Sequence, residues 1–268
     1  MGNAVTAAVA DRSALLKIER TGAVLSVGLN RPAKRNALND GIILAIGDCF
    51  AQLPEDVGAV VIHGVGDHFS SGLDLSELAD HDATEGLRHS QMWHRVFDRI
   101  QYSRVPVIAA LKGAVIGGGL ELACAAHIRV AEPSAYFALP EGQRGIFVGG
   151  GGSVRLPRLI GVARMTDMML TGRVYSATEG ASYGFAQYLV EEAGALPKAM
   201  QLAERIASNA ALTNFAVLQA LPMIAEANPQ TGLLMESLMA TVAQSDKEAK
   251  RRIRAFLEHK TAKVKPTK

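Results

Sequence analysis

Short runs of β-branched and other apolar residues alternate with helical patterns along the chain until about residue 193. The runs are short and are bounded by glycine, proline or polar residues, which is typical of strands buried in a sheet. We expect a strand hairpin over 15–20 and 23–29, a helix that begins at Asn39-Asp40, a strand over 59–63, a helix over 84–102 and a strand over 107–111. Such alternation predicts an α/β fold.

Beyond residue 193 the strand pattern disappears and helical patterns continue. They cover 196–209, 213–225, 230–244 and 246–260, with Asn and Pro between them. A length of 268 residues allows one large domain, or one domain with a smaller addition. We therefore predict an α/β core over residues 1–195, which carries the site, and a helical C-terminal region over residues 196–268.

The composition argues against several classes of protein. The formal net charge is +2, which is too small to indicate a nucleic-acid surface. No apolar run reaches the roughly 18–20 residues that a membrane span requires. Cys49 and Cys124 lie in apolar helical patterns, which favours core positions and a reducing compartment over a disulfide framework. We expect a cytoplasmic protein that binds neither nucleic acid nor a membrane.

A triple glycine, Gly117 to Gly119, opens an apolar helical pattern that contains Glu121. A glycine-opened helix directs free backbone N–H groups and the positive end of its dipole at one point. Glu121 lies three residues after Gly118, so its side chain projects from the same face of the helix as that N–H group. This arrangement places a carboxyl group beside a donor that could stabilise an oxyanion.

A second carboxyl group, that of Glu141, follows a short strand that Pro140 interrupts. If Glu141 returns to the cleft that holds Glu121, the two side chains form an acid/base pair. Two carboxyl groups in one desolvated cleft do not both ionise readily, so one stays a carboxylate and the other keeps its proton. The pair could then take a proton from water and supply another to a substrate.

The segment from His68 to Leu75 contains a Ser70-Ser71-Gly72 turn. Taken alone, this segment also fits an ordinary turn between a strand and a helix. Combined with Gly118, it offers the N–H group of Leu73 as the second donor of a two-amide oxyanion hole.

Together these motifs closely resemble those of the crotonase (enoyl-CoA hydratase/isomerase) superfamily. The resemblance extends over roughly residues 15–260, and it rests on segments that are specific in combination: Arg31 to Leu38, Phe69 to Leu75, Lys112 to Ala125, Leu139 to Glu141, Gly149 to Pro157, and Thr171-Gly172. It implies a spiral of β-β-α turns followed by a helical region that builds homotrimers, often paired into homohexamers.

The resemblance also implies a mechanism. The amides of Leu73 and Gly118 would bind the thioester oxygen of an enoyl-CoA. The residue at the position of Glu121 activates water for attack on the β-carbon, and the residue at the position of Glu141 delivers a proton to the α-carbon. Isomerases of the superfamily need only one of these acids, so the presence of both favours a hydratase. No cofactor is implied, because CoA is part of the substrate.

The same resemblance assigns six residues to CoA binding. The backbone around Ser71, with Asp74 and Leu75, would hold the adenine end, and Lys34 or Arg35 would reach the phosphates. Lys265 aligns with a C-terminal lysine that reaches CoA from a neighbouring subunit, although the aromatic residue usual before it is Val264 here.

The chain departs from common hydratases after Glu141, where it has no Ile-Pro-Gly turn but a Gly149–Gly152 run. This is either a loop variant that feeds the next helix or a change that reshapes the acyl end of the pocket. With the placement of both glutamates, the pattern looks like that of bacterial methylthioacryloyl-CoA hydratases, which act in dimethylsulfoniopropionate breakdown.

Three alternatives stay open at this point. One is a general short-chain enoyl-CoA hydratase of fatty-acid oxidation, with the same residues and another acyl group. A second is a nucleic-acid-binding homologue with a lysine-rich helix, which the low net charge disfavours. A third is a metal enzyme, which the scattered histidines disfavour because His89 and His94 lie five residues apart.

Overall fold

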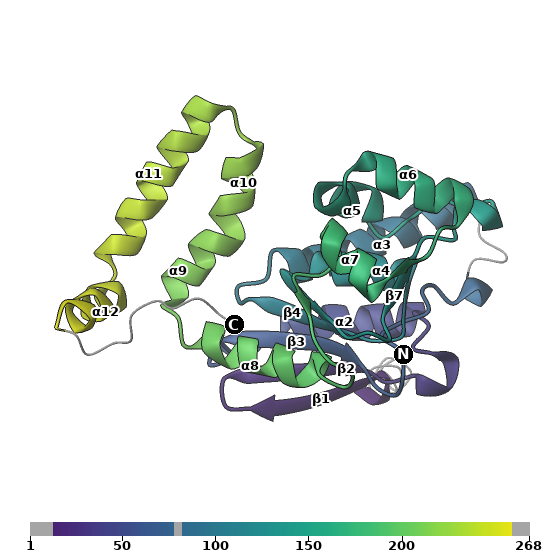
Figure 1. The fold of residues 1–268 in the computed structure, drawn as a ribbon, viewed down its shortest axis with the longest axis horizontal. Helices are drawn as coiled ribbons and strands as arrows, with labels where there is room; N and C mark the ends of the chain where they lie inside the picture. The colour runs from purple at the N-terminus through teal and green to yellow at the C-terminus, as the bar shows by residue number, and fades with distance from the viewer. Residues whose placement is uncertain (1–12, 78–81, 259–268) are drawn as a thin grey trace, which may run out of the picture. The chain divides into compact units, whose positions relative to one another are not determined.

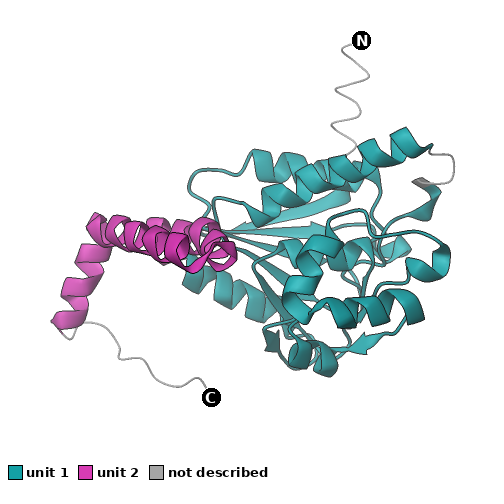
Figure 2. Cartoon of the chain, turned by 90° about the horizontal axis from the view of Figure 1, so that it is seen from above, with its two compact units in different colours: residues 1–207 teal, residues 208–268 magenta. Residues whose placement is uncertain are grey.

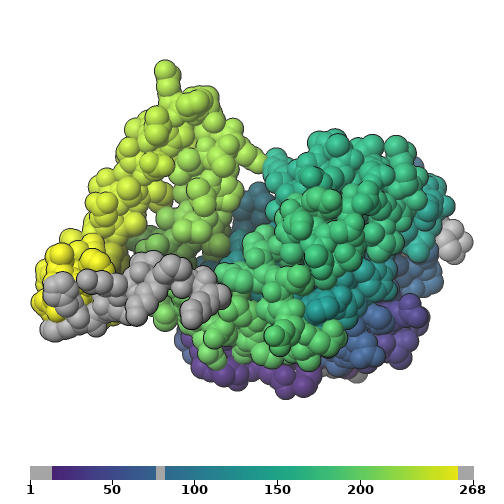
Figure 3. Space-filling view, in the orientation of Figure 1, coloured from purple at the N-terminus to yellow at the C-terminus, as the bar shows by residue number. Residues whose placement is uncertain are grey.

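The computed structural model describes residues 13–77 and 82–258 (Figure 1). The chain separates into two compact units, residues 1–207 and residues 208–268 (Figure 2). In the space-filling view, the side chains of the first unit form one continuous body, with the purple N-terminal hairpin below the teal helices (Figure 3).

A six-stranded sheet forms the base of the first unit. Its strand order is β1-β2-β3-β4-β6-β9, and every pair except β1–β2 is parallel. The strands are β1 (Leu16–Thr21), β2 (Val24–Leu29), β3 (Ala59–Gly64), β4 (Val107–Leu111), β6 (Ile128–Ala131) and β9 (Tyr188–Leu189). β3 and β4 are buried along their whole length, as central parallel strands with both faces covered must be. The predicted hairpin and both predicted strands are confirmed.

A second, three-stranded sheet lies beside the first, in the order β5-β7-β8, with β5 (Ala114–Ile116), β7 (Tyr136–Ala138) and β8 (Tyr175–Ser176). An isolated bridge joins Ser70 to Val115 and extends this sheet in the direction of the preceding turn. Between β3 and α5 the chain passes three times through the large sheet, then the small sheet or its extension at Ser70, then a helix. The predicted spiral of β-β-α turns is confirmed.

Helices cover both faces of the large sheet. One core contains Val61, Ile108 and Ala110 of the sheet and packs against Ala199 and Ala203 of α8. The larger core lies on the opposite face, beneath α2, α3 and α4 (Figure 1). The α-helices of the first unit are α2 (Asp40–Ala51), α3 (Ala83–Gln101), α4 (Gly118–Ala125), α5 (Gly152–Ile160), α6 (Val162–Thr171), α7 (Ala177–Tyr183) and α8 (Ala195–Ala207); short 3-10 turns are η1 (Ser13–Leu15), η2 (Pro32–Lys34), η3 (Leu75–Glu77) and η4 (Gly142–Arg144).

Capping residues begin the helices α2 and α3. The side chain of Asn39 accepts a hydrogen bond from the N–H group of Ile42, as the sequence predicts for α2. Asp82 and Glu85 form a reciprocal capping box at the start of α3.

The second unit is entirely helical in its described part, residues 208–258. It contains α9 (Ala211–Phe215), the π-helical turn η5 (Ala216–Ala220), α10 (Leu221–Glu226), α11 (Pro229–Ser245) and α12 (Lys247–Leu257). The predicted helical C-terminal region is confirmed. The compact units part after α8, whereas the sequence places the division at 195/196, because α8 packs on the sheet. Among the described helices, none has the length and apolar character needed to cross a bilayer.

Candidate active site

The amide of Leu73 is left free by the way its loop pairs with Leu38. In this parallel bridge Leu38 donates to Gly72 O and accepts from Asp74 N, both at 2.8 Å. Leu73 lies between those two partners, so its own N–H group points to the other side of the strand. Among the hydrogen bonds of the described residues, none has this N–H group as donor.

Gly118 supplies a second free amide, because the first residues of an α-helix have no acceptor within the helix. A Cβ atom built on Gly118 would lie 3.4 Å from the nitrogen of Leu73, so the two amides are neighbours. Backbone hydrogen bonds fix this proximity: Ser70 N donates to Ala114 O at 2.9 Å, and Ile116 N donates to Ser70 O at 3.1 Å. The two predicted donors therefore lie together.

Glu121 is 4 % exposed. Its carboxyl group is held by the Gly149–Gly152 run, for which the sequence left two interpretations. Its Oε1 atom accepts hydrogen bonds from Gly150 N at 2.8 Å and from Gly152 N at 2.7 Å. Side chains at these positions would collide with the carboxyl group, because a Cβ atom on Gly152 would lie 2.8 Å from Glu121 Cγ. Burial raises the pKa of Glu121 to about 7, against the opposing effect of the two amides.

Glu141 begins the turn η4 and is 7 % exposed. Its Oε2 atom is buried without a hydrogen-bond partner among the described residues. Burial raises the pKa of Glu141, which favours the protonated form. Gly117, at φ 51°, admits this side chain, since a Cβ atom there would lie 2.5 Å from Glu141 Oε1. A protonated Glu141 would thus have a proton with no protein acceptor.

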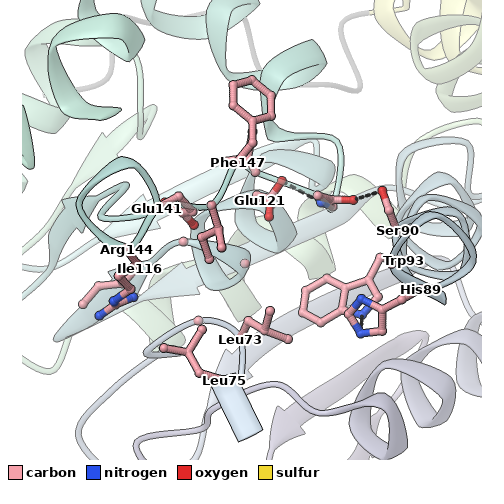
Figure 4. Close-up of a pocket in the computed structure, with 18 of the residues that line it drawn as sticks. Leu73, Leu75, His89, Ser90, Trp93, Ile116, Glu121, Glu141, Arg144 and Phe147 are labelled. Carbon is pink, nitrogen blue, oxygen red and sulfur yellow. Dashed lines mark hydrogen bonds between the residues drawn. The ribbon is translucent and has the colours of Figure 1, made fainter. Parts of the chain in front are cut away.

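Both carboxyl groups line one pocket of about 330 Å³, together with Leu73 and Gly118 (Figure 4). The charge of Glu141 contributes to the raised pKa of Glu121, so the two groups are close enough to influence each other. The remaining lining comes from three parts of the chain: Ser71, Gly72, Leu75, Ile116 and Gly117 on the loops and strand β5 of the spiral, Gly86, His89, Ser90 and Trp93 on α3, and Arg144 and Ile146 to Gly150 after Glu141. The pocket thus contains two carboxyl groups and two free amides.

The residues predicted to bind CoA divide into three groups. Ser71 and Leu75 line the pocket. Lys34, Arg35 and Asp74 do not line it, but they lie on the two adjoining loops. Lys265 lies outside the described residues.

Asp74 is bound within the protein. Its Oδ2 atom lies 3.1 Å from Arg31 Nη2 and 3.5 Å from Lys34 Nζ. The hydroxyl group of Ser76 donates to its other oxygen, and these contacts lower the pKa of Asp74. Asp74 therefore ties together the two loops that flank the pocket. This contact is structural, and the predicted role of Asp74 in binding CoA stays a prediction.

Several pocket residues were not predicted as site residues. The sequence favours a core position for Trp93; its ring is buried, and it also forms a wall of the pocket. His89 and Ser90 follow the same helix face, and Phe147 is 67 % exposed at the other side. A helix with Trp93 facing inward signals burial, and only the packing of α3 against α4 turns that face into a pocket wall.

No group of three metal-ligating side chains occurs among the described residues.

The chain is similar to several known proteins. A protein from Clostridium acetobutylicum named short-chain-enoyl-CoA hydratase is 32 % identical over 244 residues, which cover 90 % of this chain and 94 % of that protein. The 2,3-dehydroadipyl-CoA hydratase of Escherichia coli is 33 % identical over 254 residues, which cover 93 % of this chain and 98 % of that protein.

A solved structure from Rhodopseudomonas palustris, of a protein named as a candidate enoyl-CoA hydratase, is 77 % identical to this chain. It superposes with a TM-score of 0.91 and covers 95 % of this chain and 98 % of its own. The sequence pattern of the enoyl-CoA hydratase/isomerase family matches residues 19–266. With the matching fold and the relatives above, this shows that the chain belongs to the enoyl-CoA hydratase/isomerase family.

Proposed function

We propose that this protein is an enoyl-CoA hydratase that adds water across the double bond of a short enoyl thioester. One observation carries the proposal: the carboxyl groups of Glu121 and Glu141 share a pocket with the free amides of Leu73 and Gly118. A double-bond isomerase needs one carboxyl group to move a proton, whereas addition of water needs a base for the water and an acid for the carbon.

In the proposed reaction Glu121 is the base. Among the described residues, the hydrogen bonds to its carboxylate fall on Oε1, which leaves Oε2 to accept a hydrogen bond from water. A pKa of about 7 matches general-base work near neutral pH. Water loses a proton to Glu121 as its oxygen bonds to the β-carbon, and the electrons of the double bond move toward the thioester carbonyl.

The developing enolate oxygen would be stabilised by Leu73 and Gly118. Fixed amides need no reorganisation during the reaction, and one such donor is worth about 2.7–4 kcal/mol. Glu141, whose Oε2 atom has no protein partner, then gives its proton to the α-carbon as the enolate collapses. Glu121 ends protonated and Glu141 ionised, so one proton returns between turnovers.

For CoA we keep the predicted contacts as part of the proposal. Ser71 and Leu75 would contact the CoA part of the substrate at the pocket. Lys34 and Arg35 supply positive charge on the adjoining loop. Lys34 has a side chain 62 % exposed, so it is accessible to phosphates. Alanine at Lys34 or Arg35 should raise KM for crotonyl-CoA with little change in kcat, because such contacts bind ground and transition states alike.

We further propose methylthioacryloyl-CoA as the substrate. The support is the pattern after Glu141, where the loop without proline lines the pocket through Ile146, Phe147 and Val148. Hydration would put a hydroxyl group on the β-carbon that already bears the methylthio group. This thiohemiacetal loses methanethiol and leaves an aldehyde. Hydrolysis of the thioester with a second water then frees CoA and a β-aldehyde acid, which loses CO₂ to give acetaldehyde.

The test is a paired assay with crotonyl-CoA and methylthioacryloyl-CoA. Loss of enoyl-thioester absorbance reports hydration, and methanethiol and acetaldehyde are measured separately. Higher kcat/KM with methylthioacryloyl-CoA, accompanied by methanethiol, supports the specific substrate. Turnover of crotonyl-CoA alone shows a general short-chain hydratase, the activity named for the Clostridium relative. No turnover of either overturns the hydratase proposal.

We also propose that both glutamates serve the hydrolysis step. Variants Glu121→Ala and Glu141→Ala should fail to release CoA when they are given the hydrated intermediate. Release at the wild-type rate by either variant would remove that residue from hydrolysis.

A homotrimer or homohexamer is the assembly that we propose. On α11 the side chains of Leu234, Leu238 and Val242 recur every four residues and are 61 %, 60 % and 43 % exposed. Such a stripe fits burial against another copy of the chain. Light scattering on the purified protein measures the mass; a monomer would contradict the proposal.

A further inference from the structure

The glycine loop that holds Glu121 is itself held on its other side. Gly150 N donates to Glu121, and the carbonyl of the same peptide unit, Gly149 O, accepts from Ser90 Oγ at 2.7 Å. Because a trans peptide directs its N–H and C=O groups to opposite sides, fixing the carbonyl aims the amide. Gly152 N is aimed in the same way, since Gly151 O accepts from Val154 N and Arg155 N in the first turn of α5.

Between these two peptide units, the carbonyl of Gly150 accepts from Arg155 Nη1 at 3.0 Å. The guanidinium group of Arg155 is only 8 % exposed, and α3 fixes its other two edges. Nη2 donates to Asp98 Oδ1 and Nε donates to Gln101 Oε1, both at 2.6 Å. A planar guanidinium group that donates to three acceptors is held in one orientation. Because two of these acceptors lie on α3, that helix determines where Arg155 holds the loop.

We infer that Arg155, oriented by Asp98 and Gln101, is a positioning residue that keeps the amides of Gly150 and Gly152 on one oxygen of Glu121 and so leaves the other oxygen for water. The inference rests on the proposed hydratase function. Loosening this contact lets the loop shift, and the carboxylate turns with it. A displacement of about 1 Å in a catalytic group can cost about 100-fold in rate.

Arg155 also acts through its charge. The groups that face Glu121 are Glu141, which raises its pKa, and Arg155, which lowers it, besides the two loop amides. Loss of the positive charge therefore raises the pKa of Glu121, and the base is ionised only at higher pH. Lysine at position 155 keeps the charge but loses the fork, so the two effects can be separated.

The experiment compares Arg155→Met and Arg155→Lys with the wild type on crotonyl-CoA over pH 5.5–9.5. Both variants should lose about 10–100-fold in kcat, with KM within about threefold. The acid limb of the kcat profile should move to higher pH in Arg155→Met and stay in place in Arg155→Lys.

The matched control is Arg99→Met. Arg99 lies on α3 and, like Arg155, donates to a backbone carbonyl, in this case that of Gly47 in α2 at 2.7 Å. The variant Arg99→Met should have a lower melting temperature than the wild type, while kcat and its pH profile stay unchanged. If the Arg155 variants behave like Arg99→Met, losing stability but not kcat, Arg155 is only a tie between helices and the inference is wrong.

A second readout does not depend on turnover. Infrared difference spectroscopy with pH follows the carboxyl band of Glu121, which is assigned by its loss in Glu121→Gln. The titration midpoint should rise in Arg155→Met. If the titration midpoint of Glu121 is the same in Arg155→Met and the wild type, the charge effect is overturned, whether or not the protein turns over an enoyl-CoA. Inactivity of the wild type toward every enoyl-CoA would count against the proposed function alone.

Discussion

The indole ring of Trp93 lies over the α-carbon of Gly118, so close that a Cβ atom there would stand 2.8 Å from the ring. Gly118 carries one of the two amides proposed to bind the thioester oxygen. In the proposed binding mode the acyl chain beyond that carbonyl runs beside the indole, which T-stacks on Phe97 at 5.5 Å. We therefore expect the ring to limit the length of acyl chain that the pocket accepts.

We predict that Trp93→Ala shifts preference to longer substrates. The kcat/KM ratio of octenoyl-CoA to crotonyl-CoA should rise about tenfold or more, because each buried methylene contributes about 0.8 kcal/mol. Trp93→Phe retains a ring and serves as the control. An unchanged ratio in Trp93→Ala would show that another wall sets the limit.

Removal of either carboxyl group should abolish most of the hydration. For Glu121→Gln and Glu141→Gln we expect kcat for crotonyl-CoA to fall about 10²–10⁴-fold, the usual contribution of a general acid or base. Substrate affinity should change little, since both amides of the oxyanion site stay in place. A variant that retains a tenth of wild-type kcat would not be consistent with the proposed pair.

Gly117→Ala should inactivate the protein through Glu141. The new methyl group would stand 2.5 Å from Glu141 Oε1 and displace the acid. Gly22→Ala is the matched control: its φ of 57° is close to the 51° of Gly117, but a Cβ atom there meets nothing within 4 Å. Both substitutions place alanine at a positive φ, and only Gly117→Ala should lose kcat. Equal activity in the two would contradict the packing argument.

The pH profile follows from the raised pKa of Glu121. Below about pH 7 Glu121 is protonated and cannot accept a proton from water, so kcat should rise with pH through about 7. Burial also raises the pKa of Glu141, and above that pKa ionisation removes the acid, so kcat should fall there. The observed midpoints belong to the coupled pair. Initial rates with saturating crotonyl-CoA from pH 5 to 10 measure the profile, and a flat profile from 5.5 to 8.5 would count against it.

The same pKa has a consequence for stability. Between 4.5 and about 7 the folded protein holds a proton on Glu121 that the unfolded chain has released. The free energy of unfolding therefore falls as pH rises through this window, by up to about 3 kcal/mol. Glu121→Gln removes this titration, so the variant should gain stability relative to wild type from pH 5 to pH 8. Urea unfolding at both pH values measures it; an equal difference at both would contradict the assignment.

The alternation of strands and helices and the place of Glu121 at a helix start could be predicted because their signals are local, whereas the pairing of Glu141 with Glu121 followed from the resemblance to the family. The strands β3 and β4 are continuous apolar runs, and the glycines before Glu121 mark both a helix start and a free amide. The helix from Asn39 likewise follows from its capping side chain.

The rest of the site depends on contacts between distant segments. Nothing local shows that Gly150 and Gly152 meet Glu121, about thirty residues earlier in the chain, or that α3 becomes a pocket wall. The sequence also predicts the helix α8. Its place on the sheet, however, depends on two small side chains, Ala199 and Ala203, that fit against buried strands.

The small sheet has a consequence for how this site can change. Leu73 and Gly118 follow the paired segments at Ser70 and Ala114–Ile116, so the backbone register of this pairing sets the distance between the two amides. Side chains facing the acyl group can be exchanged while that register persists. One fixed pair of amides can therefore bind the thioester oxygen of many different acyl groups, and a change of substrate requires changes only in the side chains that line the pocket.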